Sequence, residues 1–365
     1  MKVPFFDLKR QASGLKEEVL AKFSEVIDNT AFTGGPFVEE LENKLQSYMD
    51  VKHAVAVNNG TNALYLALTA LGIKLGDEVI VPANTFIATA WAPSYLGAKP
   101  VFVDCDADTW NLCPKELEKA ITPKTKLIMV VHLYGQIANL DAIMKVASRH
   151  GVPVLEDNAQ ALGAGYKDKK AGTYGIISCT SFYPGKNLGA WGEAGAVFTN
   201  DSELAKKMQI LRNHGCEQRY HHEMIGFNMR MSGFQGATLS IKLDQLDTWI
   251  ARRQEIAARY KSEIKCTDLK WQKAEEHSDS VYHLFVVTTE RKEAFLKHLD
   301  ANEIGYAFHY PIPCHLQKAY QFLNYKEGDM PNSEFLANNC VSLPMFPEMT
   351  DAEVSQTINI INQFH

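Results

Sequence analysis

The chain has 365 residues, with 37 Lys and Arg against 43 Asp and Glu, a formal net charge of −6, 46% hydrophobic residues and 22% charged residues. This composition is typical of a soluble globular protein and excludes disordered, collagen-like and coiled-coil proteins. The length suits about two domains at roughly 100–200 residues each. The acidic balance argues against nucleic acid as the main partner, because binding a phosphate backbone normally needs an excess of basic residues.

The N-terminal residues lack the apolar segment of a signal peptide, and no apolar run approaches the ~20 residues of a membrane span. We therefore expect a cytoplasmic protein without a membrane partner. The cysteines are odd in number and widely scattered, which predicts free thiols in a reducing compartment, with neither a disulfide framework nor a zinc or other metal site. They are Cys105, Cys113, Cys179, Cys216, Cys266, Cys314 and Cys340.

Between residues 53 and 200, short apolar runs rich in β-branched residues alternate with helical patterns. This alternation predicts an α/β domain in which helices cover a mostly parallel seven-stranded sheet. The helices expected between the strands include Thr61–Leu71, Asn139–Arg149 and Ser202–Arg212. The predicted strands are His53–Val57, Glu78–Val81, Pro100–Val103, Leu127–Val131, Pro153–Glu156, Cys179–Phe182 and Ala196–Thr199.

A long polar helix is predicted from about residue 239 to residue 263, and after it the pattern changes to that of a smaller α+β unit. These features divide the chain into a large domain with an N-terminal arm, residues 1–260, and a small C-terminal domain, residues 261–365. The later predicted elements are a helix at Leu239–Glu263, a strand at Val281–Thr288, a helix at Arg291–Leu299, a Pro/His-rich stretch at His309–His315 and a helix at Asp351–Phe364.

A Gly-containing turn follows the first predicted strand, in the segment Asn58–Leu64. A helix that starts near Thr61 presents free backbone N–H groups and the positive end of its dipole, and both favour a phosphate. A capped helix without a ligand explains the segment equally well. The glycine patterns of dinucleotide-binding and P-loop proteins are absent.

Two further segments place reactive groups at strand ends, where an open α/β sheet forms its ligand crevice. Asp157 ends one predicted strand, and Gln160 lies three residues later. Taken alone, Asp157 is better explained as a helix N-cap. Lys186 lies in a Gly-rich, nearly uncharged loop after another strand, a setting that lowers the pKa of an amine and favours Schiff-base chemistry.

Together these groups match the needs of pyridoxal 5'-phosphate. Its aldehyde needs a lysine (Lys186), and its ring nitrogen needs a carboxylate (Asp157). Its phosphate needs a helix start and hydroxyls (Thr61 and Ser181), and its ring needs an aromatic cover (Phe86).

With these residues in place, the sequence resembles the DegT/StrS nucleotide-sugar aminotransferases, a branch of the aspartate aminotransferase fold, over essentially the whole chain. The matching passages include Asn59–Leu64, Val81–Phe86, His132–Gly135, Glu156–Gln160, Ser181–Gly195 and Gly226–Met231. The resemblance implies the fold of type I pyridoxal phosphate transferases, with a small C-terminal α+β domain.

By position, the resemblance implies an internal aldimine at Lys186 and a ring-nitrogen contact at Asp157. It also implies that Gln160 contacts the ring hydroxyl, that Phe86 stacks on the ring, and that Thr61, Asn62 and Ser181 hold the phosphate. In this family, a residue at the position of Asn228 reaches the neighbouring subunit's site. A homodimer with shared active sites is therefore implied.

The segments Ser181–Lys186 and His309–Gln317 look most like those of enzymes that aminate carbon 3 of dTDP-linked 3-oxo-6-deoxyhexoses, sugars of the O-antigen type. The implied reaction is a ping-pong transamination from L-glutamate. Carbon 4, a UDP-linked N-acetyl sugar, a pyridoxal lyase or dehydratase, and a non-catalytic regulator remain alternatives. The candidates for the sugar and diphosphate are Tyr183, Arg219, His309, Tyr310 and His315.

Overall fold

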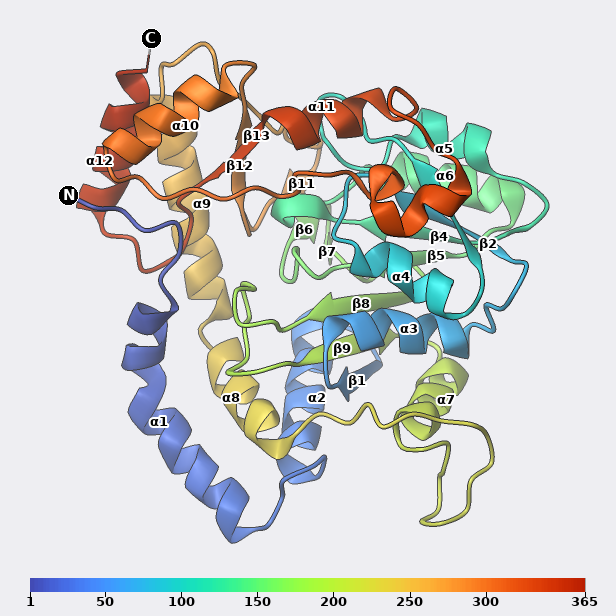
Figure 1. The fold of residues 1–365 in the computed structure, drawn as a ribbon. Coiled ribbons are helices and arrows are strands. Elements are labelled where there is room, and N and C mark those ends of the chain that lie inside the picture. The colour runs from blue at the N-terminus through green and yellow to red at the C-terminus, as the bar shows by residue number, and fades with distance from the viewer. Residues whose placement is uncertain (365) are drawn as a thin grey trace.

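The computed structural model describes residues 1–364 of the chain (Figure 1). In that range the α-helices are α1 Leu8–Asp28, α2 Pro36–Met49, α3 Gly60–Ala70, α4 Ala88–Tyr95, α5 Pro114–Ala120, α6 Leu140–His150, α7 Ser202–Arg212, α8 Gly233–Leu243, α9 Leu246–Glu263, α10 Lys292–Ala301, α11 Pro331–Asn339 and α12 Asp351–Asn362. The short 3₁₀ helices are η1 Leu133–Gly135, η2 Cys314–Leu316 and η3 Lys318–Leu323.

A seven-stranded sheet forms the centre of the molecule, in the order β1-β9-β8-β5-β4-β2-β3. All its neighbours run parallel except β9, which is antiparallel to β1 and β8. Its strands are β1 His53–Val57, β2 Glu78–Pro82, β3 Lys99–Val103, β4 Thr125–Val131, β5 Val154–Asp157, β8 Ile177–Ser181 and β9 Gly195–Thr199. The prediction of a mostly parallel seven-stranded sheet is confirmed, with strand ends shifted by one or two residues.

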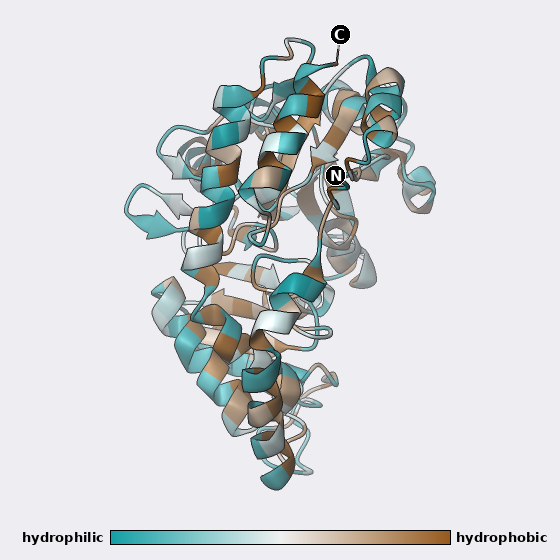
Figure 2. Cartoon of the chain, turned by 90° about the vertical axis from the view of Figure 1, so that its left-hand side faces the viewer, coloured by the Kyte–Doolittle hydropathy of each residue, from teal (hydrophilic) through white to brown (hydrophobic). Residues whose placement is uncertain are grey.

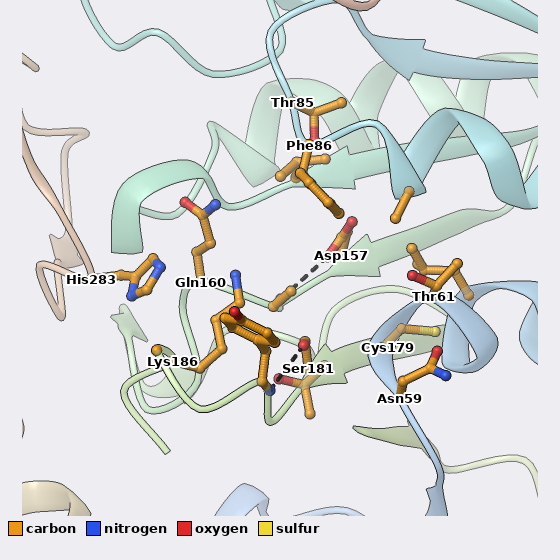
Figure 3. A pocket seen from close by; sticks show the side chains of 18 of the residues that line it. Asn59, Thr61, Thr85, Phe86, Asp157, Gln160, Cys179, Ser181, Lys186 and His283 are labelled. Atoms are coloured by element: carbon orange, nitrogen blue, oxygen red, sulfur yellow. Dashed lines mark hydrogen bonds between the residues drawn. The ribbon is translucent and has the colours of Figure 1, made fainter. Parts of the chain in front are cut away.

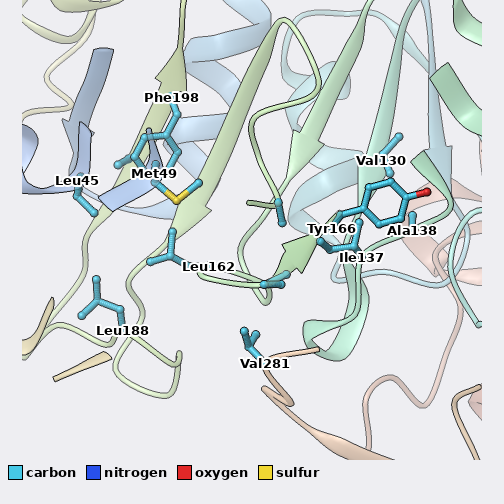
Figure 4. Close-up of a cluster of buried hydrophobic side chains, with 14 of the residues drawn as sticks. Leu45, Met49, Val130, Ile137, Ala138, Leu162, Tyr166, Leu188, Phe198 and Val281 are labelled. Carbon is cyan, nitrogen blue, oxygen red and sulfur yellow. The ribbon is translucent and has the colours of Figure 1, made fainter. Parts of the chain in front are cut away.

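Both faces of this sheet are buried, because alternate residues of each strand enter different cores. Ala54 and Ala56 of β1 belong to one core with Leu45 and Met49 of α2. Figure 4 shows Leu45, Met49 and Phe198 of β9 in this core. Val55 and Val57 of the same strand instead pack in the core that contains α3 and α7. Many helices carry brown apolar and teal polar residues on different sides, as helices that cover a sheet must (Figure 2).

The C-terminal part contains a further core, built on the small antiparallel sheet β10-β12-β13 and helices α9, α10 and α12. The strands of the two small sheets are β10 Lys270–Trp271, β12 Phe285–Thr288 and β13 Cys340–Leu343, and β6 Gly165–Tyr166, β7 Lys169–Lys170 and β11 Ser278–Asp279. Val3 joins the C-terminal core through a bridge to Ile304, and Tyr260 of α9 is buried in it. The division at residue 260 stays a prediction.

Two predicted elements of this region are wrong in their extent. The helix expected at Leu239–Glu263 is two helices, because α8 ends at Leu243 and α9 begins at Leu246. The strand expected from Val281 begins only at Phe285. The preceding residues instead lie against η1, where the N–H groups of Val281 and Leu284 donate to the carbonyls of Gly135 and Tyr134.

None of the helices within residues 1–364 combines the length and the apolar character that a bilayer crossing needs. All seven cysteines carry free thiols.

Candidate active site

The carboxyl ends of the central strands meet at a cleft of about 820 Å³ (Figure 3). Residues from the C-terminal part of the chain, among them His283 and Tyr310, also line it. This is the edge at which open α/β sheets bind their ligands. Asp157 ends β5, Ser181 ends β8, and Asn59 follows β1. The other polar and aromatic lining residues are Thr61, Asn62, Phe5, Phe6, Thr85, Phe86, Tyr95, Gln160, Thr180, Tyr183, Lys186, Glu193, His283, His309 and Tyr310.

Lys186 points into this cleft from the loop after β8 (Figure 3). The loop is closed at its base by the bond from the Ala190 N–H to the Phe182 carbonyl, at 2.8 Å, and the Lys186 N–H donates to the Tyr183 carbonyl at 2.8 Å. Burial lowers the pKa of Lys186 to about 8, although the negative charge of Asp157 acts in the opposite direction. An amine with this pKa is partly unprotonated near neutral pH, as a nucleophilic lysine must be.

Asp157 is 5% exposed and lies deeper in the cleft. Its Oδ2 accepts from the Thr89 hydroxyl at 2.8 Å, and its Oδ1 accepts from the Ala159 N–H at 3.2 Å. Burial raises the pKa of Asp157, and those two bonds and the charge of Lys186 only partly offset the effect. The N-cap explanation is wrong, because a turn and no helix follows Asp157.

Glu156, which the sequence analysis did not single out, anchors the same strand end from the opposite face. Its side chain is fully buried and bonds the His132 ring at 2.8 Å, and it accepts the backbone N–H groups of Gly172, Tyr174 and Gly175. Burial alone would raise the pKa of Glu156, but these donors lower it below its ordinary value. This ionised anchor fixes the end of β5 and thereby the position of Asp157.

The start of α3 lies against the end of β8. Asn59 caps the helix by accepting from the Asn62 N–H at 2.7 Å, so the helix begins at Gly60, one residue before the predicted Thr61. A Cβ atom at Gly60 would lie 2.5 Å from the Ser181 Cβ. Only glycine allows this approach, which brings the Ser181 hydroxyl beside the free N–H groups of the helix start.

We therefore expect Gly60→Ala to weaken anion binding at this place. Overpacking of this kind costs about 1–3 kcal/mol, which corresponds to roughly tenfold lower cofactor affinity. Titration of apoprotein with pyridoxal phosphate measures the dissociation constant. Gly14→Ala is the matched control, because nothing lies within 4 Å of its added Cβ in α1. Equal affinity in the two variants would contradict the expectation.

The far wall of the cleft combines residues from three regions of the chain. The Gln160 Oε1 accepts from the Tyr134 N–H at 2.7 Å, so the Gln160 Nε2 donates to the Tyr310 hydroxyl at 3.0 Å. Phe86 packs against the Tyr310 ring, with the ring centroids 5.7 Å apart. Half of the Phe86 side chain stays exposed, which suits a cover for a flat ligand.

Two histidines of this wall stay neutral. Burial and the charge of Lys186 lower the pKa of His309 to about 4, and its Nδ1 bonds the Ser342 hydroxyl at 2.8 Å. Burial also lowers the pKa of His283 well below its ordinary value. Because the Asn187 Nδ2 donates to the Val281 carbonyl, its Oδ1 accepts from the His283 Nδ1–H, which leaves the His283 Nε2 as an acceptor.

The structure brings ten of the predicted site residues together in this cleft and leaves three outside it. His315 is buried, pairs with Glu334 at 3.0 Å, and gives no support for a substrate contact. Arg219 and Asn228 are exposed on the segment between α7 and α8. The ten in the cleft are Thr61, Asn62, Phe86, Asp157, Gln160, Ser181, Tyr183, Lys186, His309 and Tyr310.

Sequence reasoning missed Phe5, Tyr95, Thr89 and His283. Tyr95, Thr89 and His283 belong to no local motif, so only the tertiary fold brings them to the site. The Phe5-Phe6-Asp7 passage at the N-terminus was a usable signal, because it belongs to the family resemblance.

The arrangement fits pyridoxal phosphate. Asp157 is a buried carboxylate with a raised pKa, so a cationic ring nitrogen would supply the charge that its own neighbours do not provide. Within residues 1–364, the Lys186 Nζ donates no hydrogen bond to a protein acceptor, so the amine is available to the cofactor. The cradle between Gly60 and Ser181 offers N–H and hydroxyl donors for a phosphate.

Comparison with known proteins agrees with this chemistry. The DegT/DnrJ/EryC1/StrS aminotransferase family matches residues 14–362. A relative from Streptomyces venezuelae, dTDP-3-amino-3,4,6-trideoxy-alpha-D-glucose transaminase, is 42% identical over 100% of this chain and 96% of its own length. A relative from Pseudomonas aeruginosa, UDP-2-acetamido-2-deoxy-3-oxo-D-glucuronate aminotransferase, is 41% identical over 96% of this chain and 97% of its own length.

Among solved structures, S. venezuelae DesV in complex with a ketimine intermediate superposes with a TM-score of 0.97, at 42% identity, over 99% of this chain and 98% of that one. Other matching structures are described as forms with PLP or PMP. The expected fold and cofactor are thereby confirmed. The chain belongs to the DegT/DnrJ/EryC1/StrS aminotransferase family, and its cofactor is pyridoxal 5'-phosphate.

Proposed function

We propose that the protein transfers the amino group of L-glutamate to the 3-keto carbon of a dTDP-linked 3-oxo-6-deoxyhexose by ping-pong transamination. The observation that carries the catalytic part is the meeting of Lys186, Asp157 and the α3 start in one cleft. The 42% identity with the S. venezuelae dTDP-sugar transaminase supports the sugar part. The cleft of about 820 Å³ lies in the upper part of the range of about 300–1,000 Å³ that is usual for small-molecule sites, as a cofactor together with a nucleotide sugar would need.

When bound, the cofactor supplies an aldehyde for a covalent bond with an amine and a ring that accepts the electron pair of the neighbouring carbon. Lys186 would hold the cofactor covalently at rest. With its amine free, the Lys186 Nζ would take the proton from the α-carbon of the donor and deliver it to the carbon that carries the cofactor's aldehyde. Asp157 keeps the ring nitrogen protonated, and Thr61, Asn62 and Ser181 hold the phosphate.

The outer cleft offers groups for the sugar. The Tyr310 hydroxyl accepts from Gln160, so its own proton is available to donate toward a keto or hydroxyl oxygen. Tyr183 is 54% exposed at the rim, where it can stack or donate to a diphosphate. His309 and His283, both neutral, add ring nitrogens for sugar hydroxyls, and the His283 Nε2 is an acceptor.

We further propose a homodimer in which Asn228 completes the neighbouring subunit's cleft. Asn228 is exposed and outside its own cleft, and the same segment carries exposed Tyr220, 78% accessible, and Ile225, 93% accessible. Such apolar exposure favours burial in an interface. Arg219 lies on the same segment and is the candidate there for a diphosphate contact. Sedimentation of the holoenzyme tests this proposal, and a monomer would contradict it.

The substrate proposal is tested by assaying 2-oxoglutarate release with L-glutamate and a panel of nucleotide-linked keto sugars. We expect the highest kcat/KM with a dTDP-linked 3-keto sugar. The relative that acts on a UDP-linked 3-oxo sugar makes that sugar class the second candidate. Preference for a 4-keto sugar would overturn the carbon-3 assignment. Absence of 2-oxoglutarate with every sugar would overturn glutamate-dependent transamination.

A further inference from the structure

One buried cation near the active site has no part in the chemistry described above. Lys242 of α8 is only 1% exposed, and it has no ion-pair partner among residues 1–364. Burial lowers the pKa of Lys242 to about 8, and the distant charge of Glu348 offsets this only in part. An isolated buried ammonium destabilises a fold, so its presence calls for a reason other than stability.

The Lys242 Nζ donates to the carbonyl of Gly189, in the loop that carries Lys186. This loop, residues 182–190, is compact. A Cβ atom at Gly189 would lie 2.2 Å from the Pro184 carbonyl oxygen, and the base is closed between Phe182 and Ala190. Because the loop is packed against itself, a contact that fixes Gly189 also restrains Lys186, three residues earlier.

A second contact holds the same loop from the other side. The Asn187 Nδ2 donates to the Val281 carbonyl at 3.0 Å, which ties the loop to the segment that carries His283. Two hydrogen bonds therefore restrain the loop. Lys242 of α8 binds its Gly189 carbonyl, and its own Asn187 side chain binds the Val281 carbonyl. The centroid of the Trp249 ring lies 5.6 Å from the Lys242 Nζ, within the range of a cation–π contact.

We propose that Lys242 is a positioning residue, which holds the 182–190 loop through the Gly189 carbonyl and so keeps the Lys186 amine at its working place in the cleft. The inference rests on the role proposed for Lys186. It assigns a function to a buried charge that stability alone does not explain.

The test compares Lys242→Met, which keeps the length of the side chain but loses its donors, with Lys242→Gln, which keeps an N–H donor. For Lys242→Met we expect about tenfold faster loss of the cofactor on dilution and about tenfold lower kcat, since one hydrogen bond from a charged donor is lost. The KM for both substrates stays within about twofold, because the residue touches neither. The Tm is equal to or above that of the wild type, and Lys242→Gln recovers most of the loss.

A readout without cofactor separates this inference from the proposed function. In the apoprotein, hydrogen exchange at the Ala190 amide is expected to be about tenfold faster in Lys242→Met. The matched control is Lys44→Met, which removes a lysine that donates to the Ser240 carbonyl of the same helix at 3.0 Å, outside the 182–190 loop. Wild-type exchange and cofactor retention in Lys242→Met would overturn the inference, as would a lowered Tm with equal losses in Lys242→Gln. If the wild type never bound the cofactor covalently, the proposed role of Lys186 would be overturned. The hydrogen exchange of the Ala190 amide in the apoprotein would still test whether Lys242 restrains the loop.

Discussion

Lys186→Ala is expected to lose transaminase turnover by about 10⁴-fold, because it removes both the nucleophile that holds the cofactor and the base that moves the proton. The Lys186 side chain is the amine that faces the cleft beside Asp157. The variant is also expected to lose the visible absorbance of the lysine-bound cofactor. Release of 2-oxoglutarate and an absorption scan after addition of pyridoxal phosphate measure the two effects.

Two variants sharpen this test. Lys186→Arg keeps a positive charge in the cleft but provides no nucleophilic amine, so its turnover falls as far as that of Lys186→Ala. Lys167→Ala removes an exposed lysine that pairs with Asp141 on the surface, and it leaves turnover unchanged. A visible absorbance that persists in Lys186→Ala would show that another lysine carries the cofactor.

The central sheet was predictable from sequence because its strands are buried on both faces. Such strands become continuous apolar runs, and the seven runs between residues 53 and 200 stand out against amphipathic helices. The two-helix break after Leu243 was not predictable, because neither Gly nor Pro marks it. Lys44 pairs with Asp244 at 2.8 Å at this break, a contact between residues 200 positions apart. Tertiary contacts of this kind have no local signature.

The residues of the candidate site likewise include some that the sequence predicts and some that it does not. Lys186, Asp157 and Ser181 lie in motifs at strand ends, so their convergence followed from the topology of a parallel sheet. His283 did not stand out, because its segment has the pattern of a strand. Its segment can lie at the cleft only because residue 135 is glycine, since a Cβ atom there would lie 2.7 Å from the backbone nitrogen of His283. The prediction for His315 had the opposite fault. Its Pro/His-rich segment suggested a substrate contact, but its side chain is buried and pairs with Glu334.

Asp157→Asn is expected to separate stability from activity. Burial raises the pKa of Asp157, so the ionised carboxylate destabilises the apoprotein at neutral pH, and its neutral isostere unfolds at the same or a higher temperature. Without the negative charge, the ring nitrogen loses the partner that keeps it protonated. Charge stabilisation of this kind is worth about 10²–10³-fold in kcat. Thermal unfolding of the apoprotein and steady-state kinetics of the holoenzyme measure the two quantities.

The neighbour that donates to Asp157 gives an independent check on the same charge. Thr89→Val removes the hydroxyl that donates to the Asp157 Oδ2 at 2.8 Å, and this bond lowers the pKa of Asp157. The acidic limb of the kcat profile is therefore expected to move to higher pH, because the carboxylate protonates earlier as the pH falls. Asp141→Asn, a change at an exposed surface carboxylate, leaves both kcat and the pH profile unchanged.

If Asp157→Asn instead lowered the unfolding temperature and kept its kcat, the carboxylate would be a structural anchor, and the positive charge of the ring would need another source.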